Sequence, residues 1–211
     1  MNFRMVVKSS VVAIPVNNSS REPHFQARNG KYCRVFLAKT PPGGYVNRMG
    51  SGVQEIHLVL DRLRSAYNVG NIFRIAEAVG AAEVVACGYT ASPPHPKLEK
   101  TAMGADKLVP CRTAESSAAA VRMLRQEGVK CVVAAEVVPG KSVFAWDYDD
   151  RFPLALVLGN EALGIAPETL EMCDGIVELP MFGRKESINV GNAAAAILYA
   201  IVAKTRMRNG K

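Results

Sequence analysis

The chain has 211 residues, of which 49% are hydrophobic and 21% charged, a composition that excludes collagen-like and wholly disordered proteins. It contains no run of about 18 consecutive apolar residues, which excludes a transmembrane helix. The 5 cysteines include no C-x-x-C pair and the 3 histidines are scattered. This pattern predicts no metal site and favours a reducing compartment, which we take to be the cytoplasm.

The net charge of +7 is concentrated in the first quarter of the chain. Residues 1–52 hold eight basic residues and one acidic residue, whereas the rest of the chain holds 18 of each sign. Segregated positive charge suits a polyanion such as RNA, although a solvated tail or an organelle transit peptide has the same composition. We therefore predict a basic, partly disordered extension over residues 1–52 and one folded domain over residues 53–211.

Strand-like and helix-like segments alternate from residue 53 onward. Nearly continuous apolar runs predict strands at residues 56–60, 83–87, 131–135, 154–158 and 175–179. Apolar residues at helical spacing predict helices at residues 71–79, 115–127, 167–173 and 189–206. The alternation indicates an α/β fold in which helices flank a parallel sheet. The last helix is apolar on most sides, so it needs cover from its own sheet and, as one option, from a second subunit.

Polar or Gly-rich clusters follow the predicted strands, where open α/β sheets bind their ligands. The first cluster holds Asn68, Gly70 and Arg74, and a helix cap at Asn68 with a surface arginine would also explain it. The second, residues 159–164, follows an apolar strand. It lacks the Lys-Ser/Thr of a phosphate-binding loop and the spacing of G-x-G-x-x-G, so it argues against a dinucleotide oxidoreductase.

The third cluster, residues 180–192, comes directly before the last predicted helix. Free backbone N–H groups at a helix start bind polar or anionic groups of a ligand. Simple capping by Ser187 or Asn189 is the alternative explanation. No single cluster identifies a function.

In this combination and order, the three clusters resemble the motifs of the SPOUT superfamily, specifically its TrmH-like RNA ribose 2′-O-methyltransferases. The motif N-x-G-x-x-x-R of that family is matched by the first cluster, and an apolar strand followed by G-N-E-x-x-G by the second. A Pro-Met turn followed by S-L-N-V is matched by the third, with Ile188 in place of Leu and with Gly191-Asn192 after it. The resemblance covers roughly residues 53–206.

The resemblance implies a C-terminal deep trefoil knot, bound S-adenosylmethionine, no metal, and a homodimer whose active site combines residues of both subunits. The implied cofactor contacts are Gly159, Leu179, Met181 and Ile188. The implied catalytic residues are Arg74, Asn68, Glu161, Ser187 and Asn189.

The implied reaction transfers a methyl group from a sulfonium to a ribose 2′-hydroxyl of tRNA or rRNA. That hydroxyl is a poor nucleophile near neutral pH, so the site must orient it and stabilise developing negative charge. The family's arginine is described as a general base. Because a guanidinium gives up its proton only with difficulty, we favour a role for Arg74 in holding phosphate and hydroxyl oxygens instead.

Contacts to RNA are expected from basic residues in loops near the same edge of the sheet, with the basic extension as a further contact. These residues are Arg62, Arg64, Lys97 and Lys100. His95 fits a structural role better than a catalytic one. Two other functions stay open: a SPOUT-fold methyltransferase that acts on an RNA base, and a non-catalytic RNA-binding protein that retains the fold. The polar motif residues favour an enzyme, and Asn68 with Arg74 favours ribose over base.

Overall fold

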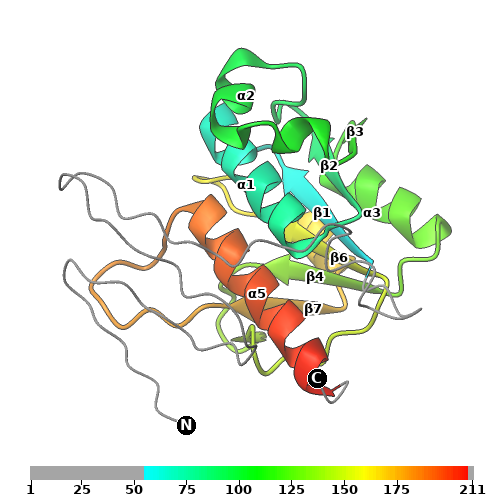
Figure 1. Cartoon of the computed structure of the whole chain (residues 1–211). Helices are drawn as coiled ribbons and strands as arrows, with labels where there is room; N and C mark the ends of the chain where they lie inside the picture. The colour runs from blue at the N-terminus through cyan, green and yellow to red at the C-terminus, as the bar shows by residue number, and fades with distance from the viewer. Residues whose placement is uncertain (1–54, 209–211) are drawn as a thin grey trace, which may run out of the picture. The chain divides into compact units, whose positions relative to one another are not determined.

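A parallel seven-stranded sheet forms the centre of the domain in the computed structural model, which describes residues 55–208 and their side chains up to residue 204 (Figure 1). The strands are β1 (Ile56–Asp61), β2 (Glu83–Cys87), β3 (Cys111–Ala114), β4 (Cys131–Ala135), β5 (Ser142–Phe144), β6 (Leu154–Leu158) and β7 (Gly175–Glu178). Their order is β3-β2-β1-β6-β4-β7-β5, and neighbours pair in parallel. The predicted α/β class is confirmed, and the predicted extension over residues 1–52 lies outside the described residues.

Five of these strands coincide with the predicted apolar runs, and the last of them ends at Glu178, one residue earlier than predicted. The edge strands β3 and β5 were missed. Both are short, and their residues are at most half-buried, so neither has the continuous apolar run that marks a strand covered on both faces. The outer strands of this parallel sheet therefore could not be predicted from apolar runs.

The helices are α1 (Ala66–Val79), α2 (Pro96–Ala102), α3 (Ser117–Gln126), α4 (Pro167–Glu171) and α5 (Val190–Arg208), with a short 3-10 helix η2 (Ala105–Lys107) after α2. The predicted start of the first helix was wrong: α1 begins five residues earlier. Its N-cap is Ser65, whose hydroxyl accepts a hydrogen bond from the backbone N–H of Asn68, so Asn68 is not the cap. The helix α2 was not predicted, because it has only two turns and follows a Pro-rich segment.

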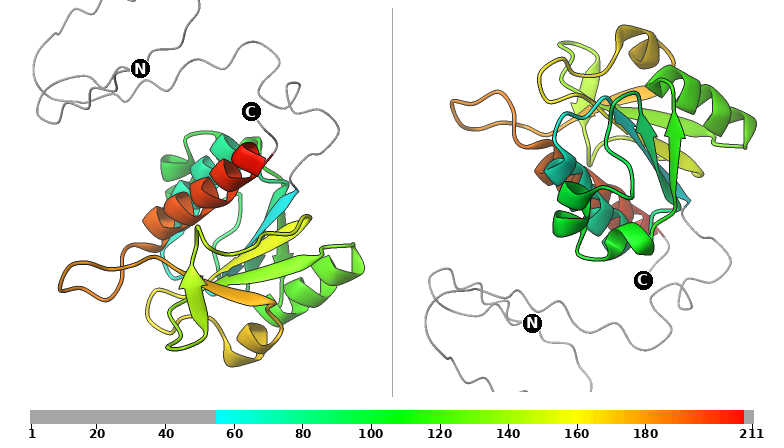
Figure 2. Two further views of the ribbon diagram at one scale, coloured as in Figure 1. Left: turned by 90° about the horizontal axis from the view of Figure 1, so that it is seen from below. Right: turned by 90° about the horizontal axis from the view of Figure 1, so that it is seen from above.

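Helices cover both faces of the sheet, and each face has its own core (Figures 1 and 2). Successive side chains of a strand point to opposite faces. In β1, Ile56, Leu58 and Leu60 pack with α1 and α5, whereas Val59 packs with α3. Burial on both sides explains why the central strands are apolar at nearly every position.

The helix α5 packs against α1, and its first residues lie near the carboxyl edge of the sheet, beside the ends of β4 and β6. Among the described residues, no helix combines the length and apolar character required to cross a membrane. The trefoil knot stays a prediction of the family resemblance.

Candidate active site

A pocket of about 580 Å³ opens at the carboxyl edge of the sheet, where β4, β6 and β7 end and α5 begins. Its walls come from the segments 135–137, 158–164, 177–181 and 186–190, together with the first turns of α5. This volume lies within the range of about 300–1,000 Å³ that is usual for ligand sites. The carboxyl edge of an open parallel sheet is also the usual place for one.

All four residues predicted to contact the cofactor line this pocket. They are Gly159, Leu179, Met181 and Ile188. They belong to two segments of the chain that follow β6 and β7, and these strands are both neighbours of β4 in the sheet. Of the predicted catalytic residues, Glu161, Ser187 and Asn189 also line the pocket. The second and third motifs therefore meet around one cavity.

The loop after β6 owes its shape to Asn160 and two glycines. The backbones of Asn160 and Gly164 exchange hydrogen bonds of 3.1 and 2.9 Å, and the Asn160 side-chain oxygen accepts from two N–H groups within the loop. Gly164 has a φ of +67°, which favours glycine. A Cβ on Gly159 would lie 2.7 Å from the backbone of Gly164, so a larger residue does not fit.

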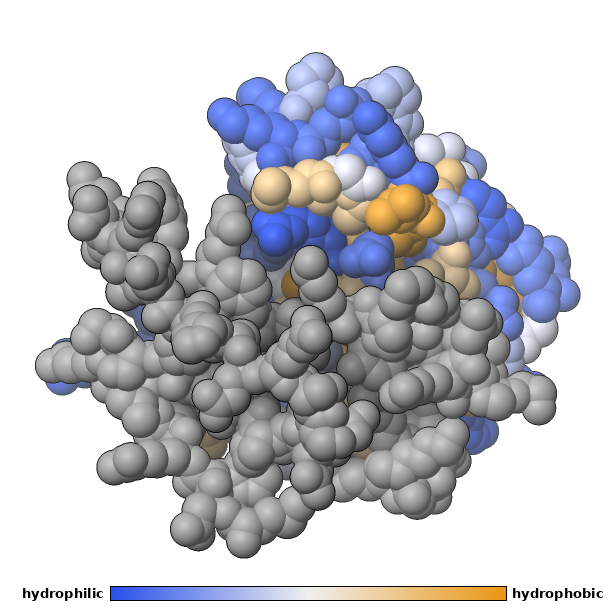
Figure 3. Space-filling view, in the orientation of Figure 1, coloured by the Kyte–Doolittle hydropathy of each residue, from blue (hydrophilic) through white to orange (hydrophobic). Residues whose placement is uncertain are grey.

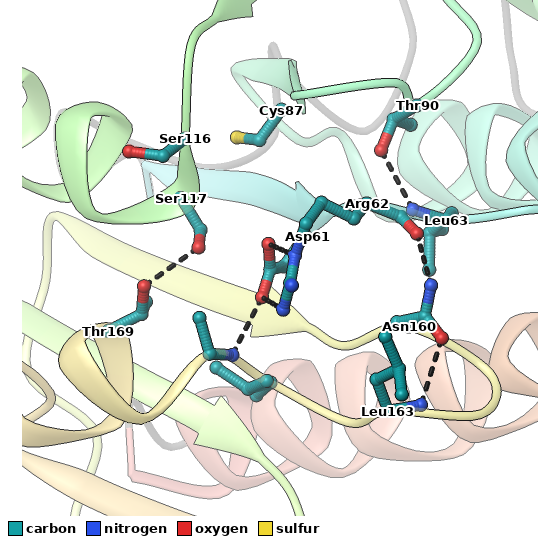
Figure 4. A network of polar contacts seen from close by, with 12 residues as sticks. Asp61, Arg62, Leu63, Cys87, Thr90, Ser116, Ser117, Asn160, Leu163 and Thr169 are labelled. Atoms are coloured by element: carbon teal, nitrogen blue, oxygen red, sulfur yellow. Dashed lines mark hydrogen bonds and ion pairs between the residues drawn. The ribbon is translucent and has the colours of Figure 1, made fainter.

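Asn160 was part of the sequence motif but was not predicted as a site residue. It is buried, and its amide donates to the backbone carbonyl of Arg62 and to the hydroxyl of Tyr89 at 2.8 Å. These bonds fix the loop after β6 against the loops after β1 and β2, and Figure 4 shows the bond to the Arg62 carbonyl. Asn160 therefore positions the pocket wall rather than facing a ligand with its amide.

Glu161 joins the second motif to the first. Its carboxylate accepts hydrogen bonds from the backbone N–H groups of Arg64 at 2.8 Å and Ser65 at 3.2 Å, and from the side-chain amide of Asn68 at 2.8 Å. Partial burial opposes ionisation, but these donors outweigh it and hold the pKa of Glu161 below its usual value. Glu161 is therefore an ionised acceptor that orients Asn68.

Asn68 joins the first motif to the third. Its side-chain oxygen accepts a hydrogen bond of 2.9 Å from the amide of Asn189. The side-chain oxygen of Asn189 in turn accepts from the backbone N–H of Gly191, so Asn189 caps α5. Capping by Asn189 was one of the two alternatives predicted for the third cluster. The hydrogen-bonded series Glu161–Asn68–Asn189 joins all three predicted clusters. Asn68 is 93 positions from Glu161 and 121 positions from Asn189 in the sequence.

Gly70, the glycine of the first motif, serves the packing of two helices. It is buried in α1 where α2 crosses. A Cβ at this position would overlap the Thr101 hydroxyl and the backbone carbonyl oxygen of Leu98. The Thr101 hydroxyl donates to the carbonyl of Tyr67 at 3.1 Å, which holds the two helices together. Gly70 therefore allows α2 to lie directly against the helix that carries Asn68.

Arg74 lies apart from the pocket of its own chain. It is exposed on α1, six residues or about 9 Å along the helix axis from Asn68, and it does not line the cavity. Ser187 lines the cavity and is exposed, and no hydrogen bond involves it within the described part of the chain. Within one chain, the structure brings together every predicted catalytic residue except Arg74.

Asp61 is a structural residue that was not predicted from the sequence. It is only 1% exposed at the end of β1, and it accepts hydrogen bonds from the Arg62 guanidinium at 2.9 and 3.1 Å and from the backbone N–H of Ala166 at 2.8 Å (Figure 4). The bond to Asp61 raises the pKa of Arg62 above its usual value. The sequence pattern that could have predicted a structural role for Asp61 is a single acidic residue directly after an apolar run. The charge of Arg62 is thus already compensated inside the protein.

The other predicted RNA contacts are exposed. Arg64 lies in the loop after β1, whereas Lys97 and Lys100 lie on α2 and not in a loop as predicted. The upper part of the molecule, where α2 lies, is largely hydrophilic in Figure 3. His95 is the N-cap of α2, since its ring nitrogen accepts a hydrogen bond from the N–H of Leu98, and this supports its structural role.

The charged side chains that line the pocket are all carboxylates. They belong to Glu136, Glu161, Glu178 and Glu186, and no Lys, Arg or His from the described residues joins them. Glu136 is bonded to the backbone N–H groups of Val137 and Ile165. Glu178 accepts from the hydroxyl of Ser142 at 2.5 Å. The lining therefore favours a ligand with positive charge and disfavours a polyphosphate.

Residues 55–199 match the SpoU rRNA Methylase family over about two thirds of the chain. The chain belongs to this family. A relative within it is the 23S rRNA (guanosine-2′-O-)-methyltransferase RlmB of Ralstonia nicotianae, 34% identical over 145 residues, which are 69% of this chain and 57% of that protein. Another is the 23S rRNA (uridine(2479)-2′-O)-methyltransferase of Streptomyces viridochromogenes, 32% identical over 148 residues, 69% of this chain and 51% of that one.

Solved structures of the SpoU family share this fold. The methyltransferase AviRb of Streptomyces viridochromogenes, in complex with the cofactor AdoMet, has a TM-score of 0.65 and 30% identity over 72% of this chain and 58% of that one. The AdoMet-bound rRNA methyltransferase of Sinorhizobium meliloti has a TM-score of 0.65 and 29% identity over 72% of this chain and 56% of that one. This SpoU family chain thus spans a little more than half the length of these relatives.

Proposed function

We propose that this chain is an S-adenosylmethionine-dependent methyltransferase that acts on a ribose 2′-hydroxyl of rRNA or tRNA. The observation that carries the proposal is a pocket at the carboxyl edge whose charged lining residues, among those that the structure describes, are all carboxylates. Relatives in sequence are named as 2′-O-methyltransferases, and two solved structures of similar fold are described with AdoMet bound. Membership of the same family supports the same reaction here.

The residues of the pocket fit S-adenosylmethionine. This cofactor carries a sulfonium and an ammonium group, and nearby carboxylates stabilise both charges, whereas they repel the phosphates of a nucleotide. We propose that Gly159, Leu179, Met181 and Ile188 hold the cofactor, because all four line the pocket. When bound, it supplies a methyl group that is activated by the positive sulfur.

We propose that Asn68, Glu161, Ser187 and Asn189 position the ribose. The bonds from Glu161 to Asn68 and from Asn189 to Asn68 fix these side chains at the rim of the pocket before substrate arrives. The hydroxyl of Ser187, which is exposed there, is available to the ribose or its phosphate. Arg74 stabilises the negative charge that develops on the 2′-oxygen, because a guanidinium is a permanent cation that offers hydrogen-bond donors and no acceptor.

We further propose that the active unit is a homodimer in which Arg74 serves the pocket of the second copy. The pocket of a single chain lacks this guanidinium, although every other predicted catalytic residue is at or bonded to its rim. An exposed tyrosine, Tyr199, on α5 offers apolar surface for such a contact. A shared site reconciles the sequence motif with the position of Arg74.

Mixed dimers test the shared site. Arg74→Ala removes the guanidinium, and Ile188→Trp fills the pocket from a half-exposed position without entering the core. Each variant alone is expected to be inactive. Co-refolding of equal amounts restores about a quarter of the wild-type sites, because half of the dimers then contain one intact site of two. If the mixed dimers recover no activity, Arg74 serves the pocket of its own chain and the shared site is refuted.

For RNA, we propose contacts from Arg64, Lys97 and Lys100, which are exposed, rather than from Arg62, whose charge Asp61 compensates. The basic residues in 1–52 supply a further contact by their charge. Removal of residues 1–52 is expected to weaken RNA binding and to reduce its dependence on salt, while cofactor affinity stays the same.

The decisive experiment incubates the purified chain with S-adenosylmethionine and with bulk rRNA or bulk tRNA from cells that lack the gene. Digestion to nucleosides and mass spectrometry identify the product. The expected product is a 2′-O-methylnucleoside, whose methyl group stays with the sugar fragment. A methylated base would instead support the base methyltransferase considered from the sequence. Absence of both products, with no calorimetric signal for S-adenosylmethionine, would support the non-catalytic alternative.

A further inference from the structure

The segment between β7 and α5 forms a loop that extends from the body of the domain at the mouth of the pocket. Figure 2 shows it as the orange loop that projects outward in both views. The residues at its two ends line the pocket, Met181 on one side and Glu186 on the other. The residues between them do not. This part of the loop, residues 182–185, therefore lies just outside the rim of the proposed active site.

Phe182 belongs to this loop and directly follows Met181, which lines the pocket. Its side chain is 95% exposed, the highest value among the exposed large hydrophobic residues of the described chain. A single exposed apolar residue is common on protein surfaces. Here Phe182 lies next to the rim of the proposed active site. The next residue, Gly183, has open space around its Cβ position. Both faces of the ring are accessible to a planar partner.

Two basic residues follow the ring. Arg184 and Lys185 are exposed, and neither forms an ion pair or hydrogen bond with another described residue. The charges of this loop are separated by position: Glu186 lines the pocket, whereas the two cations lie outside it. An aromatic ring beside free cations is the combination that binds single-stranded nucleic acid, by stacking on a base and by contact with phosphates.

We propose that residues 182–185 form an RNA-binding finger. Phe182 stacks on a base next to the nucleotide that is methylated, and Arg184 and Lys185 contact the adjoining phosphates. This inference rests on the proposed function. Stacking suits the position because it holds an unpaired nucleotide at the rim while the neighbouring ribose reaches the pocket. A contact between this loop and its own copy across a two-fold axis is disfavoured, because it would bring the cations of both loops together.

The test compares RNA affinities of loop variants by fluorescence anisotropy with a labelled single-stranded RNA of about ten nucleotides. Phe182→Ala is expected to weaken binding about tenfold, since loss of one stacked base costs a factor of about 5 to 150. Phe182→Trp is expected to retain affinity, because it keeps a π face. The control Leu108→Ala removes another exposed apolar side chain, 70% exposed after η2, and is expected to change nothing.

The cations are tested by the salt dependence of the same binding. The double variant Arg184→Ala/Lys185→Ala is expected to lower the slope of log affinity against log salt by about 1.4, because two single-strand phosphate contacts are lost. Calorimetry with S-adenosylmethionine and sedimentation of each variant accompany these measurements. Both are expected to match wild type, since residues 182–185 do not line the pocket.

Three results separate this inference from the proposed function. If wild type methylates RNA and Phe182→Ala binds RNA equally well, the finger is refuted and the enzyme stands. If Phe182→Ala shifts the sedimentation to monomer, the ring belongs to an interface between copies, and the finger is again refuted. If wild type neither binds S-adenosylmethionine nor methylates any RNA, the proposed function itself fails.

Discussion

The crossing of α1 and α2 at Gly70 yields a prediction whose size follows from the structure. Replacement by alanine favours the helix by about 1 kcal/mol, because glycine is the weaker helix former. The new Cβ would overlap the Leu98 carbonyl oxygen and lie 2.9 Å from the Ala102 nitrogen, and both are backbone atoms that no rotamer change can move. Overpacking of this kind costs about 1–3 kcal/mol. Because backbone atoms are in the way, we place the cost for Gly70→Ala at about 3 kcal/mol or above, from which the gain in helix propensity is subtracted.

We therefore expect Gly70→Ala to destabilise the domain by about 2 kcal/mol, and to lower its melting temperature by roughly 4–8 °C. Urea and thermal unfolding followed by circular dichroism measure both quantities. Gly183→Ala serves as the control, because nothing lies within 4 Å of its Cβ position, and it is expected to have wild-type stability. If Gly70→Ala proved as stable as wild type, the close approach of the two helices would not explain the motif glycine.

Two further predictions concern charged groups away from the pocket. Burial opposes the ionisation of Glu83, but bonds from Arg112 and His57 outweigh it and lower its pKa. The free energy of unfolding should therefore fall as the pH drops below the usual Glu pKa of about 4.3, and urea titrations should show a smaller fall for Glu83→Gln. Lys204→Met removes the cation that pairs with the buried Asp150 carboxylate and should cost about 3 kcal/mol. Adding Asp150→Asn should restore much of this loss, and equal losses in the single and double variants would contradict the pairing.

The sequence determined the layers of the fold and, through its motifs, most of the residues that meet at one pocket. Strands buried on both faces must be apolar at nearly every position, so β1, β2, β4, β6 and β7 were predictable from apolar runs in the sequence. The edge strands and α2 were not, because short or half-exposed elements leave no such pattern. The four expected cofactor contacts were identified by motif, and all line one pocket.

Only the tertiary structure decided how these residues are held. The bonds of Asn68 to Glu161 and Asn189 join positions 93 and 121 apart, and they depend on the order of strands in the sheet, which local patterns do not specify. The same holds for Arg62, which looked like a free cation until the fold placed its guanidinium on Asp61. Local periodicity reports burial, whereas the pairing of polar groups depends on which distant segments the packed core brings into contact.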